Sequence, residues 1–301
     1  MANLPFLAIV NPAAGGGRCG GLATAALERV RRAGVELKVA YTKKRGEAMA
    51  LARRAYESGT SKFLAVGGDG TSYEIINGLF PNALGRVRPT LGLLPLGTGN
   101  SFLRDFTSRG VEHAIEAVIA RRSRSCDVIR LLHSTGELYF MNLLTLGFPA
   151  DVGELTNRRF KGWGERGYIL GVFSRLAGLK QLPFPHRIGG AVDWDRRVCL
   201  FLSFNNSKFT GGKMMIAPQA DPSDGLIECV RWSPVSRLQL IRLFPRLFTG
   251  THIDHPLASR AQSQYVEFDI DHPVNVMVDG EILRLQPQRL EVLPAALDVM
   301  V

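Results

Sequence analysis

Short apolar runs alternate with helical stretches along the first 125 residues, and this alternation constrains the fold more than any other feature of the chain. The runs FLAIV, ELKVAYT, FLAV and TLGLLP read as strands, and a helical stretch follows each of them. Such an alternation is typical of a parallel sheet that helices cover on both faces. We therefore predict an N-terminal α/β domain with an open parallel sheet over residues 1–125.

The pattern changes after residue 126. The segments that now read as strands, with turns between them, are SCDVIRLL, ELYFMNLLTLGF, RRVCLFLSFNN, LIECVRW, YVEFDI and VNVMVDGE. Helical insertions interrupt them only near residues 158–182 and 235–248. We predict a second domain over residues 126–301, an antiparallel β-sandwich, and the last residues of the chain could pack back on the first domain.

The chain is strongly basic, with a formal net charge of +10 and a pI near 9.8. This charge favours an anionic partner, which could be a nucleic acid, a phosphorylated small molecule or an anionic membrane surface. No apolar stretch approaches the roughly 18 residues that a membrane-spanning helix needs. We expect a cytoplasmic protein that could lie on a membrane, and a homodimer is compatible with the sequence.

Four polar or glycine-rich loops follow the predicted parallel strands, at residues 11–17, 42–46, 67–71 and 97–100. Ligands of open α/β sheets bind where the carboxyl ends of the strands meet. Ordinary turn chemistry explains any one of these loops. Together they favour a ligand that carries several phosphate groups.

The stretch GGDGTSYEIINGL, at residues 67–79, follows one of these strands directly. Glycines let backbone N–H groups approach an anion, and the start of a helix favours negative charge at the same place. A phosphate would explain the glycines, and a metal bound to that phosphate would explain Asp69. The alternative is a tight turn between strand and helix, with Asp69 as a local cap.

Other nucleotide motifs fit the sequence poorly. GGGRCG, at residues 15–20, matches the dinucleotide pattern G-x-G-x-x-G, but the next strand ends in AYTKK, without the acid that binds the ribose. The chain has no G-x-x-x-x-G-K-[ST] phosphate loop and none of the protein-kinase signatures. These absences disfavour a Rossmann-type NAD site and a protein kinase.

Five motifs occur in a characteristic order, namely NPAAGGG, GGDGTSYEIINGL, PLGTGN, LGFPADV and DGE. In this order and spacing they resemble the diacylglycerol kinase catalytic domain family, which includes sphingosine and ceramide kinases and bacterial lipid kinases. The resemblance covers nearly the whole chain, although GGDGT also occurs in NAD kinases. It implies a nucleotide-binding α/β domain of the type found in NAD and diacylglycerol kinases, followed by a β-sandwich that holds a lipid.

The resemblance also implies roles for individual residues. ATP would be bound by Asn11, Gly16, Thr42, Gly67, Gly68, Asp69, Gly70, Thr71, Glu74, Gly97, Thr98 and Asn100. The loop ADPSDGLIE resembles a metal-binding loop of the family, in which Mg²⁺ would be bound by Asp221, Asp224 and the carbonyl of Leu226. Magnesium prefers such oxygen ligands. The alternative for this loop is an Asp-Gly turn between two strands.

Glu281 ends the motif DGE. The resemblance implies that this glutamate is the general base that accepts the proton of the acceptor hydroxyl. Asp69 would act near the phosphates and their magnesium, and Asp279 would support Glu281 or the nucleotide. Without the resemblance, the motif reads as an Asp-Gly hairpin turn followed by a surface acid.

The predicted activity is an ATP- and magnesium-dependent lipid kinase, with diacylglycerol as the first choice of acceptor. Sphingosine kinases place an acid two positions beyond the equivalent of Asp151, where this chain has Gly153, so we favour a neutral acceptor. A shift of one residue in the alignment would give Glu154 that role. The alternatives are a sphingosine- or ceramide-like kinase, an NAD kinase, and a non-catalytic regulator, although an inactive protein would not need Asp69 and Glu281.

Two segments alternate basic and apolar residues, at 158–187 and 235–250. Such segments can bind an anionic membrane surface peripherally, and they can equally pack within a domain with a solvated basic face. None of the usual nucleic-acid-binding motifs is present, so we expect no nucleic acid as partner.

Overall fold

The computed structural model describes residues 5–159 and 178–301, and the side chains of these residues except 154–159. The chain divides into two compact units, one formed by residues 1–128 and 294–301 and the other by residues 129–293. The first unit is an α/β domain with a parallel sheet, and the second is built on antiparallel sheets, as the sequence predicted. The predicted division after residue 125 falls inside strand β5 (Ser123–His133).

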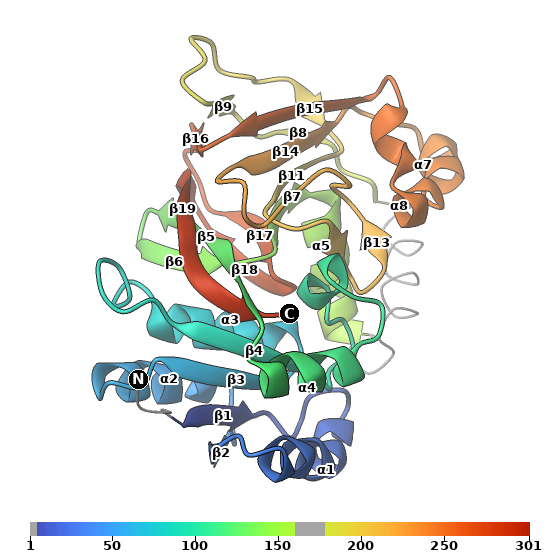
Figure 1. The fold of residues 1–301 in the computed structure, drawn as a ribbon. Coiled ribbons are helices and arrows are strands. Elements are labelled where there is room, and N and C mark those ends of the chain that lie inside the picture. Colours follow the sequence, from blue (N-terminus) through green and yellow to red (C-terminus); the bar gives the residue numbers. More distant parts are fainter. Residues whose placement is uncertain (1–4, 160–177) are drawn as a thin grey trace. The chain divides into compact units, whose positions relative to one another are not determined.

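The first unit alternates strands and helices (Figure 1). Its elements before β5 are β1 (Phe6–Val10), α1 (Arg18–Arg32), β2 (Leu37–Tyr41), α2 (Glu47–Glu57), β3 (Lys62–Gly67), α3 (Asp69–Leu79), β4 (Thr90–Pro95), the 3₁₀ helix η1 (Phe102–Asp105) and α4 (Val111–Ala120). The buried residues of α1 show why it is helical: Cys19, Ala23, Leu27 and Val30 recur every three or four positions and form one apolar face.

The strands of this sheet lie in the order β2-β1-β3-β4 and run parallel. The chain moves outward from β1 to β2 and then returns past β1 to β3, so right-handed crossovers place α1 and α2 on opposite faces. Contacts agree with this arrangement, because α1 touches α4 whereas α2 touches α3. The strand order therefore reverses between β1 and β3, and the carboxyl ends of these two strands form the switch point at which ligands of such sheets bind.

The last residues of the chain add a strand to this sheet. The end of β19 (Pro287–Met300) pairs with β4 in parallel, with Asp298 opposite Thr90 and Met300 opposite Gly92. The carboxylate of Asp298 accepts hydrogen bonds from Arg88 and Ser125 at 3.3 and 2.9 Å. The C-terminus is thus part of the parallel sheet.

The second unit is rich in strands. After β5 its elements are β6 (Gly136–Phe140), β7 (Leu143–Gly147), α5 (Phe148–Arg159), β8 (Leu182–Pro183), β9 (His186–Ile188), β10 (Val198–Cys199), β11 (Phe201–Asn205), β12 (Phe209–Thr210), β13 (Met214–Met215), β14 (Ile227–Trp232), α7 (Arg237–Leu243), α8 (Arg246–Thr249), the 3₁₀ helix η3 (Thr251–Asp254), β15 (Ala258–Ser263), β16 (Tyr265–Phe268), β17 (Val274–Val278), β18 (Glu281–Leu285) and the start of β19.

Six of these strands form a sheet in the order β15-β14-β11-β7-β17-β18, and its pairings are antiparallel. Buried side chains from this sheet, such as Phe201 and Trp232, pack in one cluster with Val152 of α5 and Leu240 of α7. Of the two predicted helical insertions, the first falls largely on residues 160–177, which lie outside the described residues. The second is divided at Pro245 into α7 and α8.

None of the helices within residues 5–159 and 178–301 is long and apolar enough to cross a membrane.

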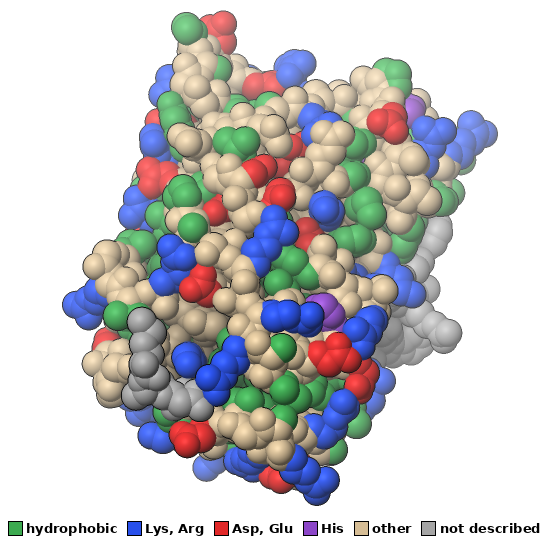
Figure 2. All heavy atoms as spheres, viewed as in Figure 1, with side chains coloured by type: hydrophobic (Ala, Val, Ile, Leu, Met, Phe, Trp, Pro, Cys, Tyr) green, Lys and Arg blue, Asp and Glu red, His purple; other side chains and the backbone are tan. Residues whose placement is uncertain are grey.

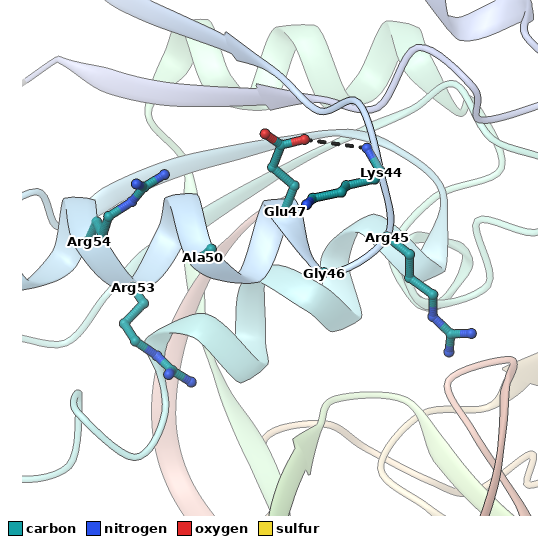
Figure 3. Close-up of a pocket in the computed structure, with 7 residues that line it drawn as sticks. All are labelled: Lys44, Arg45, Gly46, Glu47, Ala50, Arg53 and Arg54. Carbon is teal, nitrogen blue, oxygen red and sulfur yellow. Dashed lines mark hydrogen bonds between the residues drawn. The ribbon is translucent and has the colours of Figure 1, made fainter.

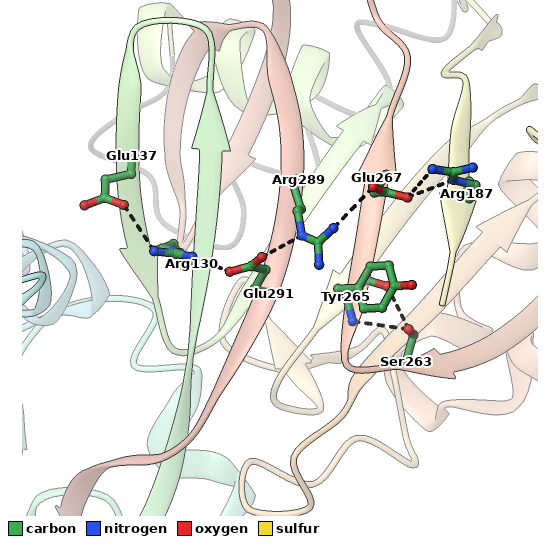
Figure 4. Close-up of polar contacts among 8 residues, drawn as sticks. All are labelled: Arg130, Glu137, Arg187, Ser263, Tyr265, Glu267, Arg289 and Glu291. Carbon is green, nitrogen blue, oxygen red and sulfur yellow. Dashed lines mark hydrogen bonds and ion pairs between the residues drawn. The ribbon is translucent and has the colours of Figure 1, made fainter. Parts of the chain in front are cut away.

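A row of alternating charges runs across β6, β5, β19, β16 and β9 of the second unit (Figure 4). The row consists of Glu137, Arg130, Glu291, Arg289, Glu267 and Arg187, which we call the charge ladder. Arg289 donates to Glu291 at 2.6 Å, and its guanidinium lies 4.3 Å from the centre of the Tyr265 ring. Each inner member has partners of opposite sign on both sides, so the ladder joins neighbouring strands through their side chains.

Glu291 sits in the middle of the charge ladder with its side chain only 25% exposed. Burial raises the pKa of Glu291, but hydrogen bonds from Arg130 and Arg289 outweigh burial, so the pKa is lowered overall. A carboxylate with a lowered pKa in the folded state stabilises that state above its unfolded pKa. The contribution is lost as the pH falls through the folded pKa.

We predict that Glu291→Gln lowers the free energy of unfolding by about 2 kcal/mol at pH 7, between the values typical of exposed and buried pairs. The control is Glu116→Gln, which removes an ion pair with Arg109 whose glutamate is 48% exposed, and it should change the free energy of unfolding much less, because solvent screens exposed pairs. Urea unfolding at pH 7 and at pH 3.5 measures both. Equal losses in the two variants, or a Glu291→Gln effect that does not shrink in acid, would contradict this role of the ladder.

Candidate active site

Two glycine loops of the first unit touch through their backbones. The N–H of Gly97 donates to the carbonyl of Gly67 at 2.7 Å, which joins the loop after β4 to the loop after β3. A Cβ atom on Gly97 would lie 2.4 Å from the Cα of Gly68. The side chain that every other residue carries would separate these loops, so glycine is required for their contact.

The loop after β1 lies against the same region. Gly15, Gly16 and Gly17 have φ values of 63°, 69° and 91°, in the left-handed region that favours glycine. A Cβ atom on Gly15 would lie 2.8 Å from the carbonyl oxygen of Leu96, so this loop approaches the loop after β4 closely. Three of the four predicted phosphate loops therefore converge at the switch point of the sheet.

Asn11 and Thr71 link the end of β1 to the start of α3. The Asn11 amide donates to the Thr71 hydroxyl at 3.4 Å, and its carbonyl oxygen accepts the Ala13 N–H at 3.2 Å. The Asn11 N–H also donates to the carbonyl of Val66 at 3.0 Å. These bonds fix the loop after β1 to the loop that begins with Gly67.

Asp69 is the first residue of α3, and it does not act as the local cap that the alternative interpretation proposed. The N-cap of α3 is Gly68, with no side-chain capping bond. Instead, the two carboxylate oxygens of Asp69 accept the N–H of Ser101, at 2.9 and 3.1 Å, from the loop after β4. Burial raises the pKa of Asp69, and the N–H bond from Ser101 partly offsets this. Ser101 follows PLGTGN directly, but the motif alone did not point to it.

Asn100 and Thr98 have different positions in the loop after β4. Asn100 has a φ of 50°, and its side-chain amide donates to the carbonyls of Pro95 and Gly97 at 3.2 and 3.0 Å. This amide holds the loop in shape. Thr98 is exposed at the surface of the loop, where its hydroxyl can meet a ligand.

Glu74 and Thr42 organise the fourth predicted loop, which follows β2. Glu74 accepts the N–H groups of Gly46 and Ala48 at 2.8 and 3.1 Å, so its carboxylate binds the free backbone donors at the start of α2. The buried Thr42 donates its N–H and its hydroxyl to the carbonyl of Val10. Both residues hold the loop, and their predicted contacts with ATP stay predictions.

A hollow of about 440 Å³ lies beside this loop. Figure 3 shows its basic lining, with Arg45 and Arg53 on one side of α2 and Arg54 on the other. Glu47 also lines it, but its carboxylate accepts the N–H groups of Lys43 and Lys44. The hollow therefore favours anions. Arg53 and Arg54 could not be singled out from the sequence, because a basic helix face normally indicates only solvent exposure.

The predicted metal loop belongs to the second unit and is closed by its own aspartates. The Asp221 carboxylate accepts the N–H of Ser223 at 3.0 Å, and the Asp224 carboxylate accepts the N–H of Leu226 at 2.9 Å. In the described part of the chain, no three His, Cys, Asp or Glu side chains gather as a metal site. The two carboxylates and a carbonyl nevertheless fit Mg²⁺, which takes one or two carboxylates and keeps several waters.

Glu281 begins β18, directly after a two-residue hairpin turn. Val278 and Glu281 face each other across the hairpin, and the turn residues Asp279 and Gly280 have φ values of 48° and 87°. Two residues with positive φ match the type I′ turn that suits hairpins. The hairpin of the alternative interpretation is therefore present.

Asp279 is not a surface residue, since it is only 5% exposed. Its carboxylate accepts the backbone N–H groups of Met141, Asn142 and Leu143 at 3.2, 3.1 and 3.0 Å. The hairpin turn is thus fixed to the two residues between β6 and β7 and to the start of β7. Asp279 positions the strand end that carries Glu281, and its predicted role toward the nucleotide is untested.

We predict that Asp279→Asn lowers the free energy of unfolding by about 3 kcal/mol, because an amide would weaken three charge-assisted bonds and could turn its own N–H toward backbone donors. The matched control is Asp271→Asn, an exposed aspartate of the same unit, which should change little. Urea unfolding followed by circular dichroism measures both. An unchanged midpoint for Asp279→Asn would mean that the carboxylate does not hold the turn.

Comparison with known proteins agrees with this architecture. Residues 5–131 match the diacylglycerol kinase catalytic domain, and residues 142–301 match the YegS C-terminal NAD kinase beta sandwich-like domain. A diacylglycerol kinase of Mycobacterium tuberculosis is 30% identical over 298 residues, which cover 97% of this chain and 94% of the relative. A probable YegS-like lipid kinase of Chromohalobacter salexigens is 32% identical over 277 residues, covering 90% of this chain and 86% of the relative.

A solved structure shares the fold. The crystal structure of a putative diacylglycerol kinase from Bacillus anthracis superimposes with a TM-score of 0.79 and 22% sequence identity, covering 98% of this chain and 94% of that one. The resemblance found in the motifs is therefore confirmed over both units. This chain belongs to the diacylglycerol kinase family, together with the diacylglycerol kinase and the probable lipid kinase named above.

Proposed function

We propose that this lipid kinase uses ATP and Mg²⁺ to phosphorylate the hydroxyl group of a neutral lipid, with diacylglycerol as the first choice. We also propose that it works in the cytoplasm, at the surface of a membrane. The observation that carries the proposal is the convergence of the loops after β1, β3 and β4, in which glycine backbones touch and Asp69 binds the loop after β4.

The glycine loops support ATP as the phosphoryl donor. Phosphate groups are bound by backbone N–H groups in glycine-rich loops and at the start of helices, and α1 and α3 both begin directly after such loops. The basic hollow beside the loop after β2 adds positive charge on the same unit. In this proposal Thr98 and the backbone of residues 67–71 contact the phosphates, and Asp69 keeps the two loops together.

Asp221, Asp224 and the carbonyl of Leu226 would hold Mg²⁺. Bound there, the ion would neutralise negative charge that develops during phosphoryl transfer. The aspartates also close the loop through the N–H groups of Ser223 and Leu226, so the positions of their carboxylates are already set.

The neutrality of the acceptor is supported by the surroundings of Gly153 in α5. A Cβ atom at this position would lie 2.6 Å from the Ile282 side chain and 3.6 Å from the sulfur of Met277. An acid at position 153, as in the sphingosine kinases, would have to displace Ile282. Because Ile282 fills the space next to Gly153, this position has no room for a carboxylate that could pair with an amine of the acceptor. The side chain of Glu154 lies outside the described residues.

In the proposed reaction, a residue of this chain accepts the proton that the acceptor hydroxyl loses. The acceptor oxygen attacks the γ-phosphorus of ATP and forms a new P–O bond, while the bond to the β-phosphate oxygen breaks and ADP leaves. Glu281 takes the proton of the hydroxyl as the new bond forms. The hairpin turn fixed by Asp279 holds the backbone of Glu281 in place.

A panel of acceptors tests the proposal. We expect labelled ATP to transfer its phosphate to diacylglycerol, and not to sphingosine, ceramide or NAD, when the products are separated by chromatography. In the same assay Glu281→Gln should lower turnover by about 10²- to 10⁴-fold, because glutamine cannot accept the proton. Glu57→Gln, a change of an exposed glutamate of α2, is the control.

Labelling of sphingosine or NAD alone would contradict the proposed acceptor. Near-normal turnover of Glu281→Gln on the best lipid would remove Glu281 as the base and leave Asp69 as the candidate. Measurement of ATP affinity separates these outcomes from a loss of nucleotide binding, which Glu281→Gln should leave unchanged.

We predict that Asp224→Asn weakens magnesium binding while the loop keeps its shape, because the asparagine oxygen can still accept the N–H of Leu226. Titration with Mg²⁺ should raise the melting temperature of the wild type. The variant should need about 10-fold more Mg²⁺ for the same rise, since even the loss of an outer-shell partner of a metal ligand typically lowers metal affinity by about 10- to 100-fold. Asp193→Asn changes an exposed aspartate and serves as the control. An identical response of Asp224→Asn and wild type would remove the metal assignment.

A further inference from the structure

Helix α7 exposes apolar side chains to solvent although its other face is buried. Leu240 and Leu243 are buried in the same cluster as Trp232. On the outer face, Leu238 is 67% exposed and Ile241 is 42% exposed. These two residues are three positions apart, so they lie next to each other on the helix surface.

Basic side chains surround this exposed pair. They are Arg237, Arg242 and Arg246, and no Asp or Glu occurs between residues 233 and 253. Arg242 and Arg246 are exposed and make no ion pair with any residue that the structure describes. Figure 2 shows blue basic and green apolar side chains where Figure 1 labels α7. We call these five residues, Leu238, Ile241 and the three arginines, the α7 surface.

The α7 surface is a fixed part of the second unit. Ser236 and Gln239 form a capping box at the start of α7, with bonds of 3.3 and 2.8 Å. Phe244 packs against the buried cluster and contacts the edge of Phe248, with ring centres 5.7 Å apart. Folding therefore leaves Leu238 and Ile241 exposed on a helix that is anchored on its other side.

We propose that the α7 surface binds an anionic lipid bilayer, with Leu238 and Ile241 in the boundary between headgroups and acyl chains and the arginines at the lipid phosphates. This inference rests on the proposed function, because a lipid acceptor has to be taken from a membrane. Exposed apolar side chains with cations next to them are features of helices that lie in the membrane interface, and the next acid after α7 is the exposed Asp254 of η3. Most of the other basic segment, at 158–187, lies outside the described residues.

A second copy of the chain fits the α7 surface less well. A symmetric contact through this patch would bring the same surface of both copies together, and with it the arginines of each copy. Like charges at close range oppose such a contact. A bilayer with negative headgroups would pair with Arg242 and Arg246 and cover the apolar pair at once.

Sedimentation with vesicles, without ATP, tests the proposal. Vesicles of phosphatidylcholine with one third phosphatidylglycerol should bind the wild type at least about 10-fold more strongly than pure phosphatidylcholine, and 0.5 M salt should remove most of this difference. Leu238→Gln with Ile241→Gln should weaken binding about 10-fold, since glutamine keeps the helix but loses apolar burial. Arg242→Gln with Arg246→Gln should weaken binding to the anionic vesicles about 25-fold, or about 5-fold for each arginine.

The control variant is Val192→Gln with Arg32→Gln, which removes an 88% exposed valine and an exposed arginine that do not belong to α7, and it should bind like the wild type. Melting temperatures show whether the variants fold, and phosphorylation of a short-chain acceptor in detergent should stay at the wild-type level in all of them. Equal binding to neutral and anionic vesicles, or wild-type binding by the α7 variants, would overturn the proposal. So would a dimer in analytical ultracentrifugation that the α7 variants abolish. Because binding is measured without ATP, its failure leaves the acceptor panel as an independent test of the kinase activity.

Discussion

The hydrogen bond from the Gly97 N–H to the Gly67 carbonyl, with a length of 2.7 Å, fixes the distance between two loops of the first unit. This distance is possible only because Gly68 and Gly97 lack side chains. The Ser101 N–H can then reach the carboxylate of Asp69, and the Asn100 side chain can close the loop after β4. The arrangement of the candidate phosphate loops thus depends on a backbone contact.

In the second unit, a turn is held in position by a different kind of interaction. There a buried carboxylate, that of Asp279, accepts the N–H groups of residues 141–143, which are the two residues between β6 and β7 and the first residue of β7. Charge-assisted bonds to backbone donors are among the stronger hydrogen bonds in proteins, and three of them hold one turn. In the first unit small residues let backbones meet, whereas in the second unit one charged side chain joins the turn to its neighbour.

Much of the fold was predictable, because the period of the apolar residues separates helices from strands. Strands that form only because their backbone pairs with a neighbouring strand were not predicted from the sequence. Strand β15 has the sequence ASRAQS, without apolar alternation, and it forms because its backbone pairs with β14. Strand β19 contains Pro294, which in a sequence indicates the end of a strand, and the structure continues the strand past it and past Ala295 with its positive φ. The segment ELYFMNLLTLGF, predicted as one strand, forms β6, β7 and the first residue of α5, with residues 141 and 142 in between.

The sequence motifs allowed us to predict which residues belong to the candidate site, but not the contacts among them. The motifs identified the loops, but no sequence pattern indicates that Glu74 accepts the N–H groups of Gly46 and Ala48, or that Ser101 donates to Asp69. Such bonds join residues that are 26 to 32 positions apart, and they follow from the packing of the sheet.

These contacts also bear on the choice between Asp69 and Glu281 as the base. A general base needs a lone pair directed at the proton of the acceptor hydroxyl. Both oxygens of Asp69 already accept the N–H of Ser101, and the same bonds hold two phosphate loops together, so proton transfer to Asp69 would weaken the site it organises. Glu281 stands directly after a turn whose position the carboxylate of Asp279 secures. The division of work that we favour follows from this difference, with Asp69 as the residue that organises the loops and Glu281 as the residue that accepts the proton.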